Sequence, residues 1–372
     1  MARLRTPAAS RIVLGILAAF GYLSLFISTL NRSNIRSNEA HLDNSSHDAY
    51  QPQWNSALIG RSERFEETLM ERVGQRPRTS SYSLGNTRFD LVDSRARLDP
   101  NKQSILVLTL VNNHDGWGKD RGFSDFVKIV QSFDYPIANI HLGILVSDRD
   151  EFNTITDLVK RWPQEDPFFR KIRVIFREKG VAIARQDRKD DNVQKVRRRL
   201  IARMRNFLLY STLGDEDAVL WIDSDMTHIP PDVLSRMVDS GKDIITTATT
   251  LGPGGPFYDL NAWAGERIKP NEQQMKEVEE GGIFVPRPLR VKYTHELSGD
   301  FAELDSVGGT VLFVRGEVHR EGVAFTTNNV IGTGWNHEGY DGIETEGLCY
   351  VAKFLDYKCW GMPHTITEHT SH

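Results

Sequence analysis

A buried strand that ends in two nearby aspartates is the feature that most restricts the fold of this chain. Residues 218–222 read Ala-Val-Leu-Trp-Ile, an unbroken apolar run with the length of a strand covered on both faces. Asp223 and Asp225 follow the run, and Pro230-Pro231 then begins a helix. A strand of this kind that leads directly into a helix predicts an α/β protein with a mostly parallel sheet.

The two aspartates also predict chemistry. Side chains at positions i and i+2 of extended backbone lie on one side, so Asp223 and Asp225 can point at one spot. Two close carboxylates repel, and a hard divalent cation with oxygen ligands removes that repulsion. Ligands of α/β sheets bind at the carboxyl ends of strands. We therefore interpret the pair as a Mn²⁺ site, with Mg²⁺ as the alternative, that holds a diphosphate. In the competing interpretation one Asp caps the next helix and the other is solvated.

Segments with strand and helix patterns alternate over much of the chain. Apolar runs predict strands and amphipathic spacing predicts helices: the strands are 104–111, 140–146, 172–176 and 244–248, and the helices are 123–133, 151–162, 193–213 and 231–240. Near the end of the chain, residues 357–360 are also strand-like. Such alternation predicts βαβ units. The sequence contains neither Gly-x-Gly-x-x-Gly nor a Walker-type loop, which removes support for dinucleotide or ATP binding. The net charge of −4 gives no argument for a nucleic-acid partner.

An uncharged apolar segment near the N-terminus predicts a membrane anchor. Residues 12–30 contain no charged side chain and are long enough to span a bilayer. Arg3, Arg5 and Arg11 precede the segment and favour a cytoplasmic tail of residues 1–11. We expect an uncleaved signal-anchor, with the rest of the chain lumenal. A cleaved signal peptide is the competing interpretation.

The region after the anchor divides into a stem and a globular domain. Residues 31–100 are rich in Ser, Asn, Arg, Glu and Gln and have few apolar clusters, which predicts a lumenal stem. Two glycosylation sequons, at Asn31 and Asn44, suit that side of the membrane. Residues 101–372 carry the strand and helix patterns, so we predict that they form the globular domain.

Two later segments supply further candidate site residues. Glu344 and Glu346 begin a helix predicted over 344–355. They can act as a base or orient an acceptor hydroxyl, or they can simply be favourable charges at a helix N-terminus. Gly308 and Gly309 precede another apolar run, where glycine lets the backbone approach a ligand.

Basic, histidine and cysteine residues leave several alternatives open. Arg199 and Arg203 lie one turn apart on the predicted basic helix, so a subset of its cations can face a phosphate while the rest form a solvated face. His369 can complete the metal site or can be solvated near the chain end. Cys349 and Cys359 can form one bridge in an oxidising compartment or remain two buried thiols.

Three blocks of sequence, taken in order, indicate a family. They are VLWIDSDMTHIPPDVL, then LDSVGGTVLFV followed by HREG, then GIETEGLCYVAKFLDYKCWGMP with a histidine near the end of the chain. Together they resemble the fungal Golgi mannosyltransferases that form the mannan polymerase complexes. The resemblance covers roughly residues 104–369 and implies a GT-A-like fold, a Rossmann-like mixed and mostly parallel sheet flanked by helices.

The same resemblance implies an activity and a cellular setting. Members of this family transfer mannose from GDP-mannose with Mn²⁺ and extend α-1,6-linked outer chains on the N-glycans of glycoproteins. Transfer from an α-linked donor to an α-linked product retains configuration. The resemblance further implies a single-pass type II protein of the Golgi membrane, or of the ER and Golgi, with other mannosyltransferase subunits and a mannosylated N-glycan acceptor as partners.

The resemblance also assigns roles to residues. Asp223 and Asp225 would ligate Mn²⁺ with His369, and Glu344 and Glu346 would lie near the donor or acceptor sugar. Residues expected near the donor nucleotide sugar are Arg203, Arg205 and Asn206 at the end of the basic helix, together with Gly308, Gly309 and Asn112. The loop that holds Asn112 is longer and more polar here than in the family.

Two other functions compete with this one. The first is glycosyl transfer from another sugar nucleotide, because a metal site grips phosphates without reading the base or the sugar. The second is a non-catalytic glycan-binding or assembly subunit. A phosphodiesterase or sugar-nucleotide hydrolase is a weaker third alternative.

Overall fold

A computed structural model describes residues 79–84, 87–162, 169–178 and 190–371, which belong to one compact unit. The predicted anchor at 12–30, both sequons and most of the predicted stem lie outside these residues. No helix within the described ranges is long and apolar enough to cross a membrane.

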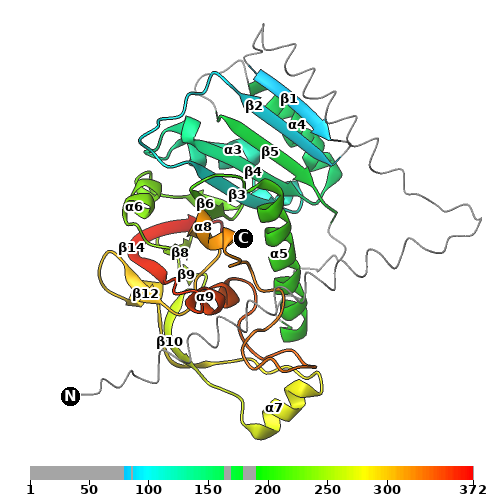
Figure 1. Ribbon diagram of the computed structural model, residues 1–372, viewed down its shortest axis with the longest axis vertical. Helices are drawn as coiled ribbons and strands as arrows, with labels where there is room; N and C mark the ends of the chain where they lie inside the picture. The colour runs from blue at the N-terminus through cyan, green and yellow to red at the C-terminus, as the bar shows by residue number, and fades with distance from the viewer. Residues whose placement is uncertain (1–78, 85–86, 163–168, 179–189, 372) are drawn as a thin grey trace, which may run out of the picture. The chain divides into compact units, whose positions relative to one another are not determined.

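One mixed sheet organises the described part of the chain (Figure 1). Ten of its twelve strands follow the order β1-β2-β5-β4-β3-β6-β13-β8-β14-β12, while β7 pairs with β14 and β9 pairs with β8. The strands are β1 Thr79–Leu84, β2 Arg88–Asp93, β3 Ile105–Val111, β4 Ile140–Val146, β5 Lys171–Phe176, β6 Ala218–Ile222, β7 Met226–His228, β8 Ile244–Leu251, β9 Phe257–Tyr258, β12 Ala302–Leu304, β13 Val311–Arg315 and β14 Cys359–His369. A separate hairpin consists of β10 Trp263–Arg267 and β11 Pro288–Tyr293.

The centre of the sheet is parallel, as predicted. β5, β4, β3 and β6 are neighbours that run in the same direction. β13 then pairs antiparallel with both β6 and β8, and β14 runs parallel to β8. These pairings confirm an α/β protein with a mixed sheet, and they bring the end of β6 close to the start of β13.

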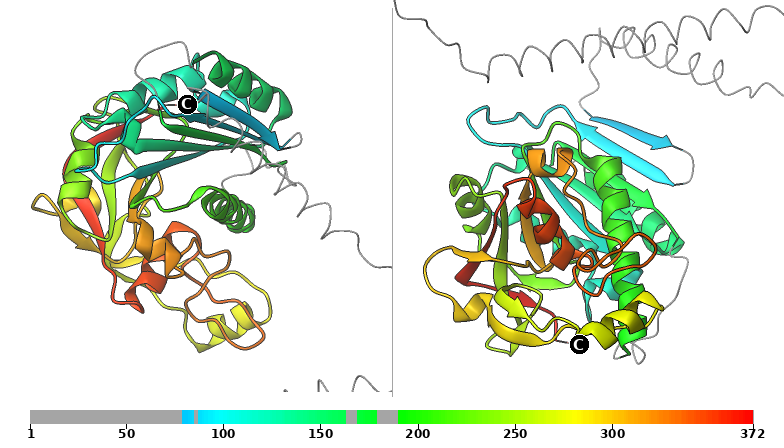
Figure 2. Two further views of the ribbon diagram at one scale, coloured as in Figure 1. Left: turned by 45° about the horizontal axis from the view of Figure 1, so that its top comes forward. Right: turned by 60° about the horizontal axis from the view of Figure 1, so that its bottom comes forward.

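Helices cover both faces of the sheet (Figure 2). One face packs against α3 Phe123–Gln131, α4 Arg149–Arg161 and α6 Val233–Asp239, and the other against α5 Asp191–Thr212, α8 Gly316–Arg320 and α9 Thr345–Lys353. Along β3, Ile105 and Val107 enter the first core while Leu106 and Leu108 enter the second, because alternate strand side chains point to opposite faces. Each such burial contributes about 1.5–3 kcal/mol. The remaining α-helix of the described residues, α7 Glu272–Glu279, lies near the β10–β11 hairpin.

The sheet extends further toward the N-terminus than the sequence predicted. Strands β1 and β2 fall inside the segment interpreted as a stem, yet β2 pairs antiparallel with β5. Phe89 and Leu91 of β2 are buried, and Asp90 accepts hydrogen bonds from Arg88 and Arg173. The predicted boundary at residues 100 and 101 therefore cuts through the sheet and has to move before Thr79. Two alternating apolar residues among charges gave too short a pattern to identify this strand.

The C-terminal tail is also more regular than predicted. A short strand was expected only at 357–360, whereas β14 continues to His369. Its register against β8 shifts between Met362 and Ile366, which accommodates Pro363, a residue that cannot donate to a strand ladder. Thr365 and Thr367 are buried in the second half of the strand, so an apolar pattern is missing there.

The cysteines form a disulfide. Cys349 of α9 is bonded to Cys359 at the start of β14, and both residues are buried. Of the two alternatives left open by the sequence, the structure contains the bridge. It ties the helix that follows Glu344 to the strand that ends at His369.

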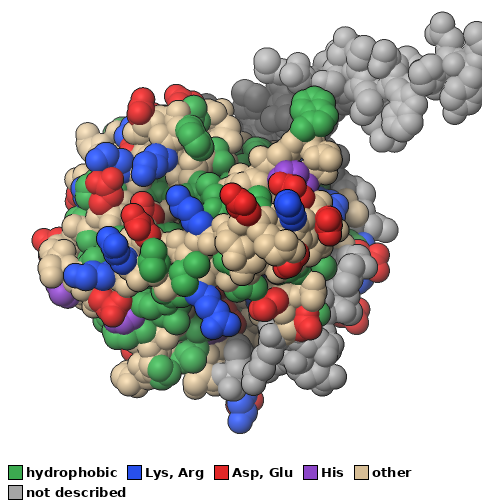
Figure 3. Space-filling view, turned by 90° about the horizontal axis from the view of Figure 1, so that it is seen from below, with side chains coloured by type: hydrophobic (Ala, Val, Ile, Leu, Met, Phe, Trp, Pro, Cys, Tyr) green, Lys and Arg blue, Asp and Glu red, His purple; other side chains and the backbone are tan. Residues whose placement is uncertain are grey.

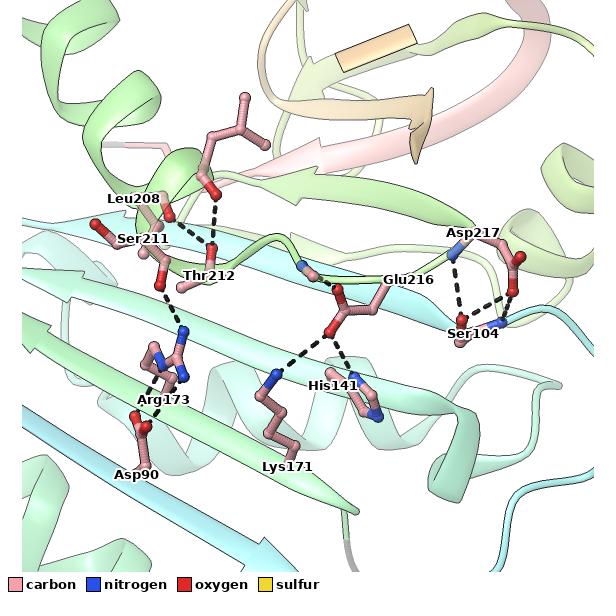
Figure 4. Close-up of polar contacts among 12 residues, drawn as sticks. Asp90, Ser104, His141, Lys171, Arg173, Leu208, Ser211, Thr212, Glu216 and Asp217 are labelled. Carbon is pink, nitrogen blue, oxygen red and sulfur yellow. Dashed lines mark hydrogen bonds and ion pairs between the residues drawn. The ribbon is translucent and has the colours of Figure 1, made fainter. Parts of the chain in front are cut away.

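A buried glutamate joins strands at the opposite end of β6 from the aspartates (Figure 4). The Glu216 carboxylate accepts a hydrogen bond from the Gly214 backbone N–H at 2.7 Å, lies 2.8 Å from His141 Nδ1 and is 3.6 Å from Lys171 Nζ. Burial alone would raise the pKa of Glu216, but the contacts with His141 and Gly214 outweigh it and lower that pKa to about 2. This network connects β4 and β5 to the segment before β6.

Candidate metal centre

Three predicted ligands come together at one end of the sheet. Ligand atoms of Asp223, Asp225 and His369 all lie within 4.8 Å of one another. The two aspartates follow β6, while His369 ends β14, far away in sequence. β7, which follows the aspartates, pairs antiparallel with β14, and Thr370 N–H donates to the Asp225 carbonyl at 3.1 Å. Strand pairing thus carries the histidine to the aspartate pair.

His369 is oriented by hydrogen bonds at both ring nitrogens. Its Nδ1 lies 2.9 Å from the Thr370 carbonyl oxygen, to which it donates, and its Nε2 lies 2.9 Å from Asp225 Oδ1. Burial lowers the pKa of His369, but the contact with Asp225 more than compensates, so the pKa is raised. Because Nδ1 carries the proton, Nε2 is the nitrogen available to a metal ion when the ring is neutral.

Asp223 is paired with an arginine of the basic helix. Arg205 donates through Nη2 to Asp223 Oδ1 and to the Gly309 carbonyl, each at 3.1 Å. Burial raises the pKa of Asp223 to about 7, against the charge of Arg205 and with a further contribution from Asp225. The Asp223 side chain is 38% exposed. A divalent cation at this position would remove the repulsion between the two carboxylates.

The two glycines before β13 contact protein side chains. A Cβ at Gly308 would lie 2.1 Å from Asp259 Oδ2, and a Cβ at Gly309 would lie 2.6 Å from Arg205 Nη1. Asp259 Oδ2 also accepts hydrogen bonds from the backbone N–H groups of Gly309 and Thr310, at 2.7 and 3.0 Å. The sequence predicted that these glycines let the backbone approach a ligand. Among the described residues, the groups that approach the glycines closely are the side chains of Asp259 and Arg205.

Asp259 itself was not predicted. It lies in an irregular segment at a positive φ of 57°, and no motif surrounds it. The sequence feature next to it is the aromatic pair Phe257-Tyr258. In the structure, Asp259 accepts a hydrogen bond from Gly309 N–H, and the Gly309 carbonyl in turn accepts one from Arg205.

The two predicted glutamates have different surroundings. Glu346 is 2% exposed and forms ion pairs with Arg198, at 2.9 Å, and with Arg267. Burial raises the pKa of Glu346, but the two arginines outweigh it and the pKa is lowered. Glu344 lies 3.7 Å from both Arg198 and Arg205, so it neighbours the arginine that holds Asp223. Glu346 is thus enclosed by ion pairs, while Glu344 adjoins the metal centre.

The other predicted donor-binding residues do not share one environment. Asn206 uses its side-chain amide on the backbone of Phe325, donating to the carbonyl at 2.7 Å and accepting from the N–H at 3.0 Å. Arg203 is exposed on α5, and Asn112 is exposed directly after β3, the parallel neighbour of β6. Within this predicted set, Arg205 is the residue that contacts a predicted metal ligand.

The polar loop after β3 lies beside the aspartates. Ser224, between the two aspartates, donates through Oγ to the Gly116 carbonyl at 2.6 Å. Arg121 donates through Nη1 to the Trp117 carbonyl at 3.1 Å. Burial lowers the pKa of Arg121, and the nearby charges of Asp125 and Asp225 partly oppose that shift. The sequence identified this loop as unusual but did not predict that its backbone contacts the Asp-Ser-Asp turn.

The donor atoms of the cluster fit a divalent cation. Two carboxylates and one imidazole form a ligand set that Mn²⁺ accepts, and the imidazole has the backbone partner that commonly orients such ligands. A cation held there can neutralise charge on a diphosphate. Acidic and basic side chains are mixed on the face seen in Figure 3, so that face presents no single-sign field of the kind that attracts nucleic acid.

Comparisons with known proteins identify relatives. A sequence model of the Anp1 family matches residues 84–329. The mannan polymerase complex subunit mnn9 of Schizosaccharomyces pombe (strain 972 / ATCC 24843) is 27% identical over 312 residues, 78% of this chain and 86% of the relative. The corresponding subunit MNN9 of Candida albicans (strain SC5314 / ATCC MYA-2876) is 25% identical over 293 residues, 72% of this chain and 75% of the relative. Among solved structures, mannosyltransferase PcManGT from Pyrobaculum calidifontis, in complex with GDP-Man and Mn²⁺, matches with a TM-score of 0.40 and 11% identity, covering 84% of this chain and 67% of that one.

Proposed function

Because this chain belongs to the Anp1 family, we propose that it is a metal-dependent, retaining mannosyltransferase with a GT-A-like fold. It uses GDP-mannose to add α-1,6-linked mannose to the outer chains of N-glycans. The observation that carries the proposal is the cluster of Asp223, Asp225 and His369, whose ligand atoms lie within 4.8 Å. The relatives named as mannan polymerase complex subunits support a role in mannan synthesis.

We assign separate roles to the residues of the centre and its neighbours. Mn²⁺, when bound, supplies positive charge that stabilises a nucleoside diphosphate leaving group. Asp223, Asp225 and His369 hold the cation, and Arg205 fixes the Asp223 carboxylate through its hydrogen bond. Glu344, 3.7 Å from Arg205, is the carboxylate best situated to orient a sugar hydroxyl. Glu346 has a structural role, because its ion pairs with Arg198 and Arg267 connect the start of α9 to α5 and β10.

The proposal includes a location and partners. The protein is a type II protein of the Golgi membrane, anchored by residues 12–30, with the described domain in the lumen. The disulfide between Cys349 and Cys359 supports a lumenal domain, because such bridges persist in oxidising compartments. Other mannosyltransferase subunits are its partners, as the names of its relatives indicate for those proteins.

Calorimetry on the full chain in detergent tests the proposal. GDP is titrated with and without Mn²⁺, with UDP as the nucleotide control. We expect Mn²⁺-dependent binding of GDP that is lost in Asp223→Asn and Asp225→Asn. Asp157→Asn, on an exposed face of α4, is the matched control and should bind normally.

Transfer of mannose from GDP-mannose to an α-1,6-linked mannose oligosaccharide is the second measurement. Preference for UDP would overturn the donor assignment. Absence of nucleotide binding and transfer in the wild-type protein would instead support a non-catalytic subunit.

A further inference from the structure

Four rings form a surface beside the metal centre that we call the aromatic ledge, made of Phe257, Tyr258, Tyr293 and His295. Phe257 stacks on His295 with ring centroids 3.6 Å apart and planes 5° from parallel. Tyr293 continues the stack on His295, at 6.1 Å and 7°. Phe257 and Tyr258 are 39% and 41% exposed. Since His295 covers one face of the Phe257 ring, a further ring that stacks on Phe257 has to use the opposite face.

The aromatic ledge is attached directly to the metal centre. The Tyr258 ring packs against the His369 ring with centroids 4.6 Å apart. Both exposed rings belong to β9, which pairs antiparallel with β8, and Gly252 N–H donates to the His369 carbonyl at 2.8 Å. Asp259, the next residue, is hydrogen-bonded to Gly309. The ledge is therefore held by the β8–β9 pairing and by the contact of Tyr258 with His369.

Sheet order separates the ledge from the expected nucleotide side. Nucleotides bind α/β sheets at the carboxyl ends of parallel strands. Of the parallel strands β5, β4, β3 and β6, the last two end near Asn112 and Asp223. The ledge extends from β8, which lies on the other side of β6 beyond β13. A donor whose diphosphate is held at the metal can place its nucleoside toward β3. The β8 side is then left for the molecule that receives the sugar.

The chemistry of the ledge fits a sugar ring. A pyranose presents a flat C–H face that packs on an aromatic ring, with hydroxyl groups around its edge left to water or polar neighbours. Ligand sites commonly combine such apolar faces with a few polar groups that set orientation. We propose that the aromatic ledge is an acceptor subsite that binds a pyranose ring of an oligosaccharide next to the metal centre. The inference rests on the proposed function, which it extends to the acceptor.

Ligand-observed NMR with the full chain and α-1,6-linked mannotriose tests this subsite. Phe257→Ala should weaken mannotriose binding at least about fivefold, since it removes one stacking face, and Phe257→Trp should retain binding. Phe354→Ala is the matched control, because Phe354 is an 86% exposed aromatic at the end of α9 and should leave binding unchanged. Mn²⁺-dependent GDP affinity should be the same in Phe257→Ala and in the wild-type protein.

Each outcome separates the subsite from the proposed enzyme. Unchanged mannotriose affinity in Phe257→Ala, or no mannotriose binding by the wild-type protein, overturns the subsite. Loss of GDP affinity in Phe257→Ala also overturns it, because the ledge would then bind the nucleobase. If the wild-type protein binds mannotriose through Phe257 but binds no nucleotide, the subsite is supported and the transferase proposal is overturned.

Discussion

Replacing Glu216 with glutamine tests how far a buried charge stabilises the sheet. Glu216 is 1% exposed, and its pKa is lowered from 4.5 to about 2 because contacts with His141 and Gly214 outweigh the effect of burial. A shift of this size corresponds to roughly 3 kcal/mol at neutral pH, at about 1.4 kcal/mol per pKa unit. Glutamine keeps the shape and can still accept from Gly214 but carries no charge. We expect Glu216→Gln to lower the free energy of unfolding by about 2–3 kcal/mol at pH 7.

The pH dependence has a definite sign. A carboxyl with a lowered pKa in the folded state adds stability at pH values above its unfolded pKa and loses it as the pH falls toward the folded pKa. The difference between wild type and variant should thus be full at pH 7 and shrink as the pH falls below about 4.5. Urea unfolding of both proteins at several pH values measures it. Glu303→Gln, in an exposed pair with Lys358, is the control and should change stability by less than about 0.5 kcal/mol. Equal stability of Glu216→Gln and wild type at pH 7, or a difference independent of pH, would refute the reasoning.

Three further outcomes follow from the structure. His369→Ala removes one of the three candidate ligands and should weaken Mn²⁺ binding at least about tenfold, measured by electron paramagnetic resonance of free Mn²⁺; unchanged affinity would exclude His369 as a ligand. Replacing both Cys349 and Cys359 by alanine opens a short loop and should cost about 2–3 kcal/mol in urea unfolding; an unchanged midpoint would contradict this. A chain beginning at residue 75 should unfold cooperatively, whereas one beginning at residue 101 lacks β1 and β2, exposes the edge of β5 and should aggregate; equal solubility would show that these strands are dispensable.

The parallel centre of the fold could be predicted because its strands are buried on both faces. The run at 140–146 was identified at its observed bounds, and the strand at 218–222 likewise. Strand β2, the second strand from one edge of the sheet, could not be found in the same way, since Phe89 and Leu91 are its main apolar signal. β14 was missed beyond residue 360 because buried Thr365 and Thr367 stand where apolar residues would otherwise be expected. Thr367 Oγ1 lies 3.0 Å from Thr247 Oγ1 and donates to the Ala248 carbonyl.

At the candidate site, local spacing was informative and long-range pairing was not. The i, i+2 spacing of Asp223 and Asp225 correctly predicted that their carboxylates converge, but the predicted extended backbone is wrong: residues 224 and 225 form a turn in which Met226 N–H donates to the Asp223 carbonyl at 3.2 Å. Spacing could not predict that Glu344 and Glu346 have different ion-pair partners. The difference arises because Arg267, a residue of the β10–β11 hairpin, pairs with Glu346. Likewise, nothing local to Asn206 indicates that its amide binds Phe325 in a distant loop.

Charge at the candidate metal centre predicts that a cation and a nucleoside diphosphate bind together. The carboxylates of Asp223 and Asp225 lie close together, and the guanidinium of Arg205 is already hydrogen-bonded to Asp223 and lies near Glu344. Burial raises the pKa of Asp223 against the charge of Arg205, and repulsion from the Asp225 carboxylate adds to that shift. A nucleoside diphosphate brought to the centre without a cation would add to this repulsion, whereas a divalent cation reverses the local charge. Binding of GDP should therefore be strongly Mn²⁺-dependent, and equal GDP affinity with and without Mn²⁺ would show that another group of cations binds the diphosphate.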